Sequence, residues 1–194
     1  MIKNIIIFLF VMGHVFGQDQ EARIFFHDGT QIDGFGSIVS NYKIKFRTSL
    51  ENKADTWTDL MVKGITFYGF QTKVKFEYHY ENSKKNWPLL LEVIEEGHVN
   101  IYIDSHIATL YVPIPLKTGF DLNSFDFKKK KIYFKRPEET EVIKFNYEFY
   151  KNAAEEYFID CPSLVTKVKN EKFRKSNVIE LLYYYNDCDD EMLD

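Results

Sequence analysis

The chain has two cysteines among its 194 residues, Cys161 and Cys188, and three kinds of chemistry are open to them. A thiol at the start of a helix has a lowered pKa, so Cys161 could be a reactive thiolate. Two isolated cysteines without a C-x-x-C motif are not a zinc pattern. A disulfide needs only an oxidising compartment. Closing the 28 residues from Cys161 to Cys188 would stabilise the fold by roughly 3.5 kcal/mol. We predict a disulfide, with free thiols and metal ligands as the alternatives.

A second group of candidate residues lies in the segment HVNIYIDSH, residues 98–106. In a regular strand, His98, Asp104 and His106 share one face, and the valine and isoleucines take the other. These residues could bind a metal for a metal-assisted hydrolase, with His79 as a further candidate ligand. Residues at i and i+2 lie about 7 Å apart, so one ion would need ligands from adjacent strands. We favour the alternative, in which this is the solvated face of a half-buried sheet.

A third group is the basic and aromatic strip at residues 125–136. Its candidate ligand contacts are Lys129, Lys131, Tyr133, Lys135 and Arg136. Basic side chains among aromatic rings can hold nucleic acid, but phosphate on lipid or polysaccharide suits an exported protein better. The alternative is an edge strand whose lysines prevent aggregation. The aromatic residues near Trp57 and Trp87 are further candidate contacts.

The N-terminus predicts export, with residues 1–17 as a signal peptide. Lys3 precedes an apolar run from Ile5 to Phe16, and small or modest side chains precede a cleavage site after Gly17. This run is shorter than the roughly 20 residues of a transmembrane helix, and we expect no membrane span after cleavage. The net charge of −4 is too mild to draw the protein to nucleic acid. We expect a periplasmic, extracellular or outer-membrane-associated protein whose partner is an envelope protein or a glycan, not nucleic acid.

The elements that must position these residues begin with a β block at residues 18–82. Period-two alternation predicts five strands in a meander that could curl into a small barrel. The Asp28-Gly29 pair predicts a hairpin with a type I′ turn, in which both residues have positive φ. Residues 49–59 read as a polar loop. The expected strands are 23–27, 30–39, 42–47, 62–70 and 73–80.

A second β block and a helical segment follow. Residues 83–147 contain two predicted hairpins, one turning at Glu96-Gly97 and one at Pro137. From residue 148 to 194 the apolar period changes to 3.6, which predicts three helices. Pro162 suits the first turn of the second helix, and Asn177 can cap the third. If those two helices are antiparallel neighbours, Cys161 and Cys188 meet. The predicted fold class is therefore α+β: antiparallel, small barrel-like β blocks followed by a short disulfide-clasped helical segment.

Several stretches together resemble a class of bacterial secreted proteins. They are "DGTQIDGFGSI…YKIKFR", "VKGITFYGF", "LLLEVIEEGHVNIY" and "YFIDCPSLV…YYYNDC". The most specific part is the spacing around Cys161 and Cys188. The resemblance covers most of residues 18–194 and implies an envelope or extracellular protein, and it brings no activity or catalytic residues.

The expected function is a non-enzymatic binding or scaffolding module of the cell envelope, with no cofactor. This expectation rests on the lack of a compact catalytic constellation in the sequence and on an analogy between short barrel-like blocks and adaptors. The alternative is the metal-assisted hydrolase described above.

Overall fold

The structure is a computed structural model that describes residues 19–40, 42–69, 72–81, 87–104, 131–170 and 178–188. Within these ranges the chain forms one antiparallel sheet and a group of short helices, which confirms the α+β class. The strands are β1 (Gln20–Phe25), β2 (Gln31–Val39), β3 (Lys43–Arg47), β4 (Asp55–Trp57), β5 (Gly64–Gly69), β6 (Thr72–Tyr80), β7 (Pro88–Glu95), β8 (Asn100–Asp104), β9 (Lys131–Lys135) and β10 (Ile143–Lys144). The helices are α2 (Tyr147–Asn152), α3 (Ala154–Tyr157), α4 (Pro162–Lys169) and α5 (Val178–Asn186). The predicted signal peptide, His106 and Lys129 lie outside the described residues.

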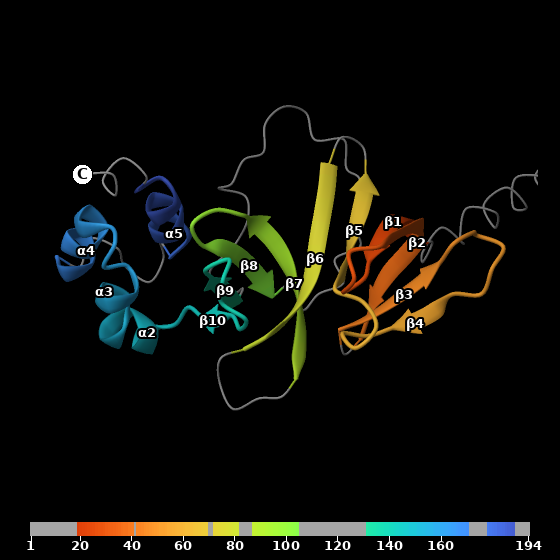
Figure 1. Cartoon of the computed structure of the whole chain (residues 1–194), viewed down its shortest axis with the longest axis horizontal. Coiled ribbons are helices and arrows are strands. Elements are labelled where there is room, and N and C mark those ends of the chain that lie inside the picture. Colours follow the sequence, from red (N-terminus) through yellow and green to blue (C-terminus); the bar gives the residue numbers. More distant parts are fainter. Residues whose placement is uncertain are drawn as a thin grey trace, which may run out of the picture.

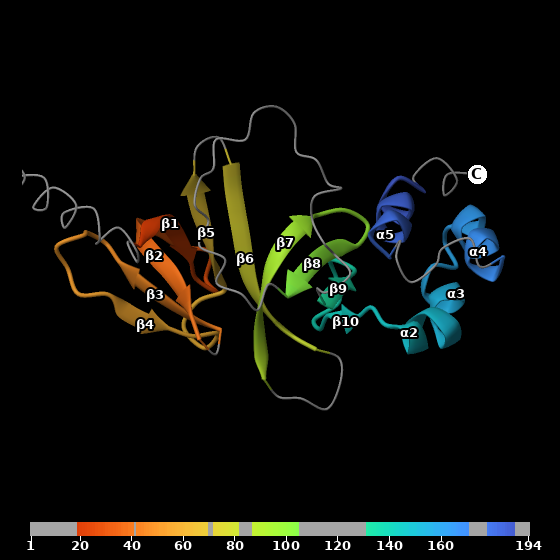
Figure 2. The ribbon, with the colours of Figure 1, turned by 180° about the vertical axis from the view of Figure 1, so that it is seen from behind.

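The sheet runs in the order β10-β9-β8-β7-β6-β5-β1-β2-β3-β4. Figures 1 and 2 show β1–β4 at one end of an elongated molecule and the helices at the other. The predicted five-stranded meander is wrong in two respects. The strand β5 pairs with β1, which lies between β5 and β2. The segment expected to be a polar loop contains the short strand β4.

The sheet is continuous across the predicted boundary between the β blocks at residues 82–83, because β6 pairs with β7. The division into blocks stays a prediction. The two hairpins of the second block are confirmed, since β7 pairs with β8 and β9 pairs with β10. Among the described residues, no helix has both the length and the apolar character needed to cross a bilayer.

The hairpin between β1 and β2 forms where Asp28-Gly29 predicts it, but with a different turn. Gly29 has a φ of 86°, and Asp28 is not among the described residues with positive φ. The N–H of Gly29 donates to the carbonyl oxygen of Phe26, and Asp28 Oδ1 accepts from the N–H of Thr30 at 2.9 Å. A turn of type I followed by one left-handed glycine therefore replaces the expected type I′ turn.

The core of the β1–β6 end is enclosed between strands that face each other. In β3, Ile44 and Phe46 are buried whereas Lys43 and Lys45 are exposed, which confirms the predicted alternation. Tyr78 of β6 donates its hydroxyl to the carbonyl oxygen of Tyr42 at 2.5 Å, so β6 reaches the start of β3. The buried members of this core are Ala22, Ile24, Ile44, Phe46, Val62, Ile65, Phe76 and Leu90.

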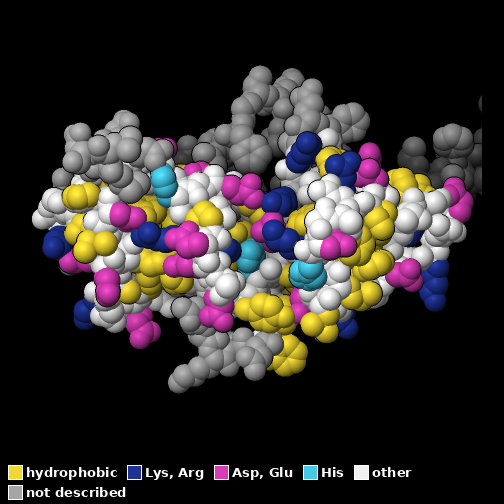
Figure 3. Space-filling model, in the orientation of Figure 1, with side chains coloured by type: hydrophobic (Ala, Val, Ile, Leu, Met, Phe, Trp, Pro, Cys, Tyr) yellow, Lys and Arg dark blue, Asp and Glu magenta, His cyan; other side chains and the backbone are white. Residues whose placement is uncertain are grey.

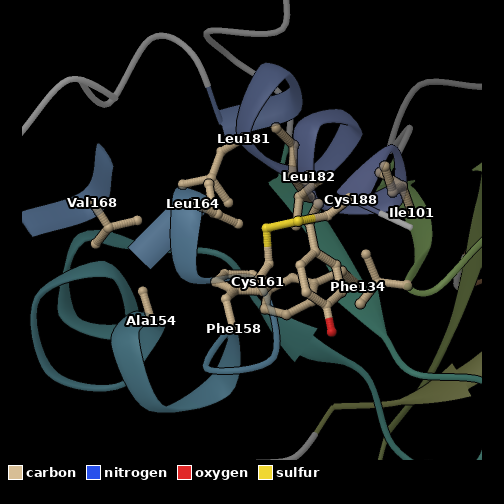
Figure 4. Close-up of a cluster of buried hydrophobic side chains, with 13 residues drawn as sticks. Ile101, Phe134, Ala154, Phe158, Cys161, Leu164, Val168, Leu181, Leu182 and Cys188 are labelled. Carbon is tan, nitrogen blue, oxygen red and sulfur yellow. A yellow bond between two sulfur atoms is a disulfide. The ribbon is translucent and has the colours of Figure 1, made fainter. Parts of the chain in front are cut away.

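The helices pack against β8 and β9 around a second core. Asn146 caps α2 by accepting the N–H of Phe149 at 2.8 Å, and Pro162 stands in the first turn of α4. The predicted disulfide is confirmed: Cys161 and Cys188 are bonded, with 6.2 Å between their Cα atoms. Figure 4 shows the bridge within this core, among side chains from α4, α5 and the sheet. Its buried members include Ile101, Phe134, Phe158, Leu164, Leu181 and Leu182.

Candidate functional site

The described part of the basic strip, residues 131–136, is not an exposed edge, because β9 lies between β8 and β10 in the sheet. Tyr133 is 2% exposed and Lys135 is 9% exposed, so both of these candidate contacts point into the interior. Lys131 stays near the surface, with its ammonium 3.4 Å from Asp104. Arg136, at the end of the strip, lines a cavity.

Lys135 organises the turn that carries Arg136. Its ammonium donates to the carbonyl oxygens of Glu139 at 2.7 Å and of Arg136 and Pro137 at 3.3 Å. Burial lowers the pKa of Lys135, while the charges of Glu77 and Glu139 act in the opposite direction. A buried lysine that holds three carbonyl groups fixes the path of residues 136–139.

Arg136 is held between two tyrosine rings. Its guanidinium carbon lies 5.0 Å from the ring centre of Tyr157 and 5.8 Å from that of Tyr185. Its Nη2 donates to the carbonyl oxygen of Tyr157 at 2.7 Å and lies 3.0 Å from Asp160 Oδ2. The arginine therefore joins the β9–β10 turn to the helices through ring stacking, a backbone hydrogen bond and an ion pair.

Asp160 is the partner of both Arg136 and Tyr185. The hydroxyl of Tyr185 donates to Asp160 Oδ2 at 2.6 Å, the same oxygen that contacts the arginine. Burial raises the pKa of Tyr185, and the hydrogen bond to Asp160 raises it further, which keeps this hydroxyl a donor. The other carboxylate oxygen, Oδ1, is enclosed and has no hydrogen-bond partner among the described residues. Roughly 30% of each side chain of the Arg136–Asp160 pair is exposed.

These residues line a cavity of about 450 Å³, here called the Arg136 cavity. Four separate segments build it: the β7–β8 turn, the β9–β10 turn, the link from α3 to α4, and the end of α5. The lining residues are Gly97, His98, Arg136, Pro137, Glu138, Asp160, Tyr185 and Asn186. Asp160 precedes Cys161, and Asn186 lies two residues before Cys188, so the disulfide ties two walls of the cavity together.

Asn186 locks the end of α5 to the β7–β8 turn. Its Nδ2 donates to Glu95 Oε1 at 2.7 Å and to the carbonyl oxygen of Val99, and its Oδ1 accepts the N–H of Val99 at 2.8 Å. A Cβ on Gly97 would lie 2.7 Å from Cγ and Nδ2 of Asn186. The glycine therefore allows the close approach of a side chain that has three hydrogen bonds.

The three candidate metal ligands that the structure describes, His79, His98 and Asp104, do not converge. His98 precedes β8 and lines the Arg136 cavity, whereas Asp104 ends β8 and contacts Tyr42 and Lys131. The ring of His79 packs on Tyr102 with their centres 4.4 Å apart. Within the part of the chain that the structure describes, no three His, Cys, Asp or Glu side chains are arranged to hold a metal ion.

The expectation of a solvated face on residues 98–106 is wrong for the described part of β8. Tyr102 is 1% exposed and Asp104 is 4% exposed, and the opposite face with Ile101 and Ile103 is buried as well. Tyr102 belongs to a third buried cluster with Leu91, Tyr133 and Val142. Strand β8 is therefore covered on both faces.

The buried carboxylate of Glu77 gives a prediction for the pH dependence of stability. Its oxygens lie 2.9 Å from Lys75 Nζ and 3.3 Å from His79 Nε2. Burial alone would raise the pKa of Glu77, but the close contacts with His79 and Lys75 and the charges of Lys75 and Lys63 outweigh burial and lower it from 4.5 to about 2. The ionised form therefore stabilises the fold fully above pH 4.5, and this contribution disappears as the pH falls toward 2.

We expect Glu77→Gln to remove about 3 kcal/mol of stability at neutral pH and to flatten its decline below pH 4.5. Urea unfolding at half-unit intervals from pH 5 to pH 2.5 measures this. Glu96→Gln is the matched control, because Glu96 contacts the same Lys75 from an exposed position. An equal decline in the wild type and Glu77→Gln would contradict the assignment.

The other sequence-predicted contacts behave differently from each other. Trp87 is 76% exposed. Trp57 packs in the first core, where its ring and that of Phe26 form a T-shaped pair with 5.7 Å between ring centres.

A second cavity of about 500 Å³ lies beside α2 and β10, with Glu148, Phe149 and Tyr157 among its lining residues. Figure 3 shows basic and acidic side chains mixed over the face that it displays, with no extended area of one sign.

The sequence reasoning missed most of the Arg136 cavity. Asp160, Tyr185 and Asn186 were not candidates, although each lies within three residues of a cysteine of the predicted disulfide. That proximity was the available signal, because a disulfide brings the flanking residues of both its cysteines together. No family model, no curated protein and no solved structure matches the chain.

Proposed function

We propose that the protein is an exported, non-enzymatic binding module and that the Arg136 cavity is its ligand site. The observation that carries this proposal is the convergence of four segments on a partly exposed Arg136–Asp160 pair. The volume of about 450 Å³ falls in the range of roughly 300–1,000 Å³ that is usual for small-ligand sites. An envelope glycan or a polar group of an envelope protein is the kind of partner that an exported module meets.

The lining of the cavity favours binding over catalysis. The described lining residues include no serine, threonine or cysteine, and two of the other groups that can act as nucleophiles, the carboxylate of Asp160 and the hydroxyl of Tyr185, are hydrogen-bonded to each other. Asp160 is already engaged by Tyr185 and Arg136, so its carboxylate is held as a recognition group. Export is supported by the signal-like N-terminus and by the disulfide, a bond that persists in oxidising compartments.

A thermal-shift screen tests the proposal with neutral oligosaccharides, acidic oligosaccharides, amino acids and nucleotides as probes. Glu138→Trp fills the Arg136 cavity from an exposed position, and Glu148→Trp fills the second cavity as the matched control. A ligand at 100 times its Kd adds about 2.7 kcal/mol of stability. We therefore expect one probe class to raise Tm by roughly 5–10 °C in the wild type and in Glu148→Trp. The same probe should have no effect on Glu138→Trp. No shift with any class, or a shift retained in Glu138→Trp, would contradict the proposal.

A further inference from the structure

The charges of the Arg136 cavity restrict its ligand. Arg136 contributes one positive charge, and Glu138 and Asp160 contribute two negative charges. An anionic ligand would meet two carboxylates, and a cationic ligand would meet the guanidinium. Because a like charge brought close in a partly enclosed site is unfavourable, the lining suits an uncharged ligand.

The hydrogen-bonding capacity that remains at the charge pair indicates the groups that the ligand carries. A carboxylate can accept about four hydrogen bonds, and Asp160 accepts its two described ones at Oδ2 while Oδ1 has none. The contacts of the guanidinium with the carbonyl oxygen of Tyr157 and with Asp160 both use Nη2, and a guanidinium carries five N–H donors in all. The pair therefore keeps unused acceptor capacity on the enclosed Oδ1 of Asp160 and unused donor capacity on Arg136.

A hydroxyl group suits this pair because it donates one hydrogen bond and accepts others. Two adjacent hydroxyl groups on one ligand can span a carboxylate and a guanidinium together. A small rotation of the Asp160 carboxylate is the movement that brings the enclosed Oδ1 to a ligand hydroxyl. The exposed ring of Pro137 and the ring of His98 add apolar surface at the same cavity.

The site is also rigid before any ligand arrives. The disulfide and the three carbonyl groups held by Lys135 fix the backbone that carries Asp160 and Arg136, and the two tyrosine rings hold the guanidinium. Pre-organisation matters most for hydroxyl-rich ligands, because each of their hydrogen bonds replaces one to water and contributes little net energy.

We propose that the Arg136 cavity binds a neutral, hydroxyl-rich ligand, a short stretch of an uncharged glycan, through the Arg136–Asp160 pair. This inference rests on the proposed function, since it assigns the ligand class of the same site. Asp160 accepts from the sugar hydroxyls, Arg136 donates to them, and Glu138 supplies a further acceptor.

Saturation-transfer NMR with the full-length exported protein tests the ligand class. The probes are neutral tetrasaccharides of glucose, mannose and N-acetylglucosamine, with tetrasaccharides of uronic acids as the charged comparison. We expect at least one neutral probe to bind and the uronic acids to bind at least tenfold more weakly. Asp160→Asn should weaken the neutral probe at least tenfold, because it removes a charged acceptor. Glu148→Gln, in the second cavity, should not change the affinity.

Glu138→Ala keeps the test decisive if Asp160→Asn unfolds, because Glu138 is exposed and the variant still removes an acceptor from the cavity. We expect a three- to tenfold loss of affinity for the neutral probe. Preferential binding of uronic acids that depends on Glu138 would overturn the ligand class and leave the proposed function standing. Sugar binding that is unaffected by Asp160→Asn and Glu138→Ala would overturn both the neutral-glycan assignment and the proposed function. The absence of any binding in this experiment and in the thermal screen would also overturn both. A cavity-dependent shift by amino acids or nucleotides alone would overturn only the neutral-glycan assignment.

Discussion

Replacing Cys161 with alanine is expected to lower the free energy of unfolding by about 3.5 kcal/mol. The bond joins residues 27 positions apart, so its loss releases a long loop in the unfolded chain. Cys161 is fully buried and Cys188 is 6% exposed. In the Cys161→Ala variant the sulfur of Cys188 therefore stays enclosed without its partner. For a chain of this size the loss corresponds to a fall in Tm of roughly 7–14 °C.

Chemical denaturation of Cys161→Ala, Cys188→Ala and the double variant measures the effect. Both single variants should lose a similar amount, and the double variant should lose little more, because one bond is broken in every case. The matched comparison is the wild type under a reductant, which should approach the single variants once the bond opens. Losses that add up in the double variant would show that the two cysteines act separately.

The disulfide also positions the Arg136 cavity, because Asp160 and Asn186 flank its two cysteines. Cys161→Ala should therefore weaken ligand binding at a temperature where the variant remains folded. The cost arises from the wall of the cavity losing its fixed place, which is the reverse of pre-organisation.

The fold class could be predicted because its signals are local, and the clasp because the chain has two cysteines, which can pair in one way. The period-two alternation of residues 43–47 and Pro162 after Cys161 each indicate one element on its own. The pairing of β5 with β1 could not be predicted in this way, because alternation identifies a strand without naming its neighbour. The burial of Tyr102 and Asp104 was missed for a related reason. Polar residues at alternate positions of β8 suggested a solvent-facing side, whereas the third buried cluster lies on that face.

The candidate site shows the same limit. Arg136 was a candidate because it stands in a basic strip, but Tyr133 and Lys135 of that strip are buried. The sequence could not assign their environment, because Tyr133 packs with Leu91 and Tyr102 from other strands and the Lys135 ammonium binds carbonyl groups of the β9–β10 turn, and these contacts form only in three dimensions. The pairing of Arg136 with Asp160 joins residues 24 positions apart, on a turn and on a helix link, and no local spacing indicates it.

Phe134→Ala is expected to lower the free energy of unfolding by about 3–5 kcal/mol. Phe134 is fully buried on β9, where the sheet meets the helices (Figure 4). Its ring lies 5.1 Å from that of Phe149 and 5.2 Å from that of Tyr157, measured between ring centres. The truncation leaves a void where a ring joined several others, and the neighbours relax only in part.

The effect of Phe134→Ala should be concentrated in the helices. Tyr157 packs on Phe134 and also accepts the hydrogen bond of Arg136, so the loss extends directly to the Arg136 cavity. Phe46→Ala is the matched control, because Phe46 is buried in the first core at the other end of the sheet. Both variants should lose comparable stability, but only Phe134→Ala should lower the affinity of the cavity for its ligand.

Amide hydrogen exchange separates the two variants element by element. In Phe134→Ala the amides of α4 and α5 should exchange faster at conditions that leave β1–β3 protected, because local opening needs only the second core to loosen. In Phe46→Ala the order should reverse. Uniform acceleration over the whole sheet and all helices in both variants would mean that the two cores unfold as one cooperative unit. In that case the Arg136 cavity would depend on the global stability of the chain, and the contact between Phe134 and Tyr157 would have no special role in holding it.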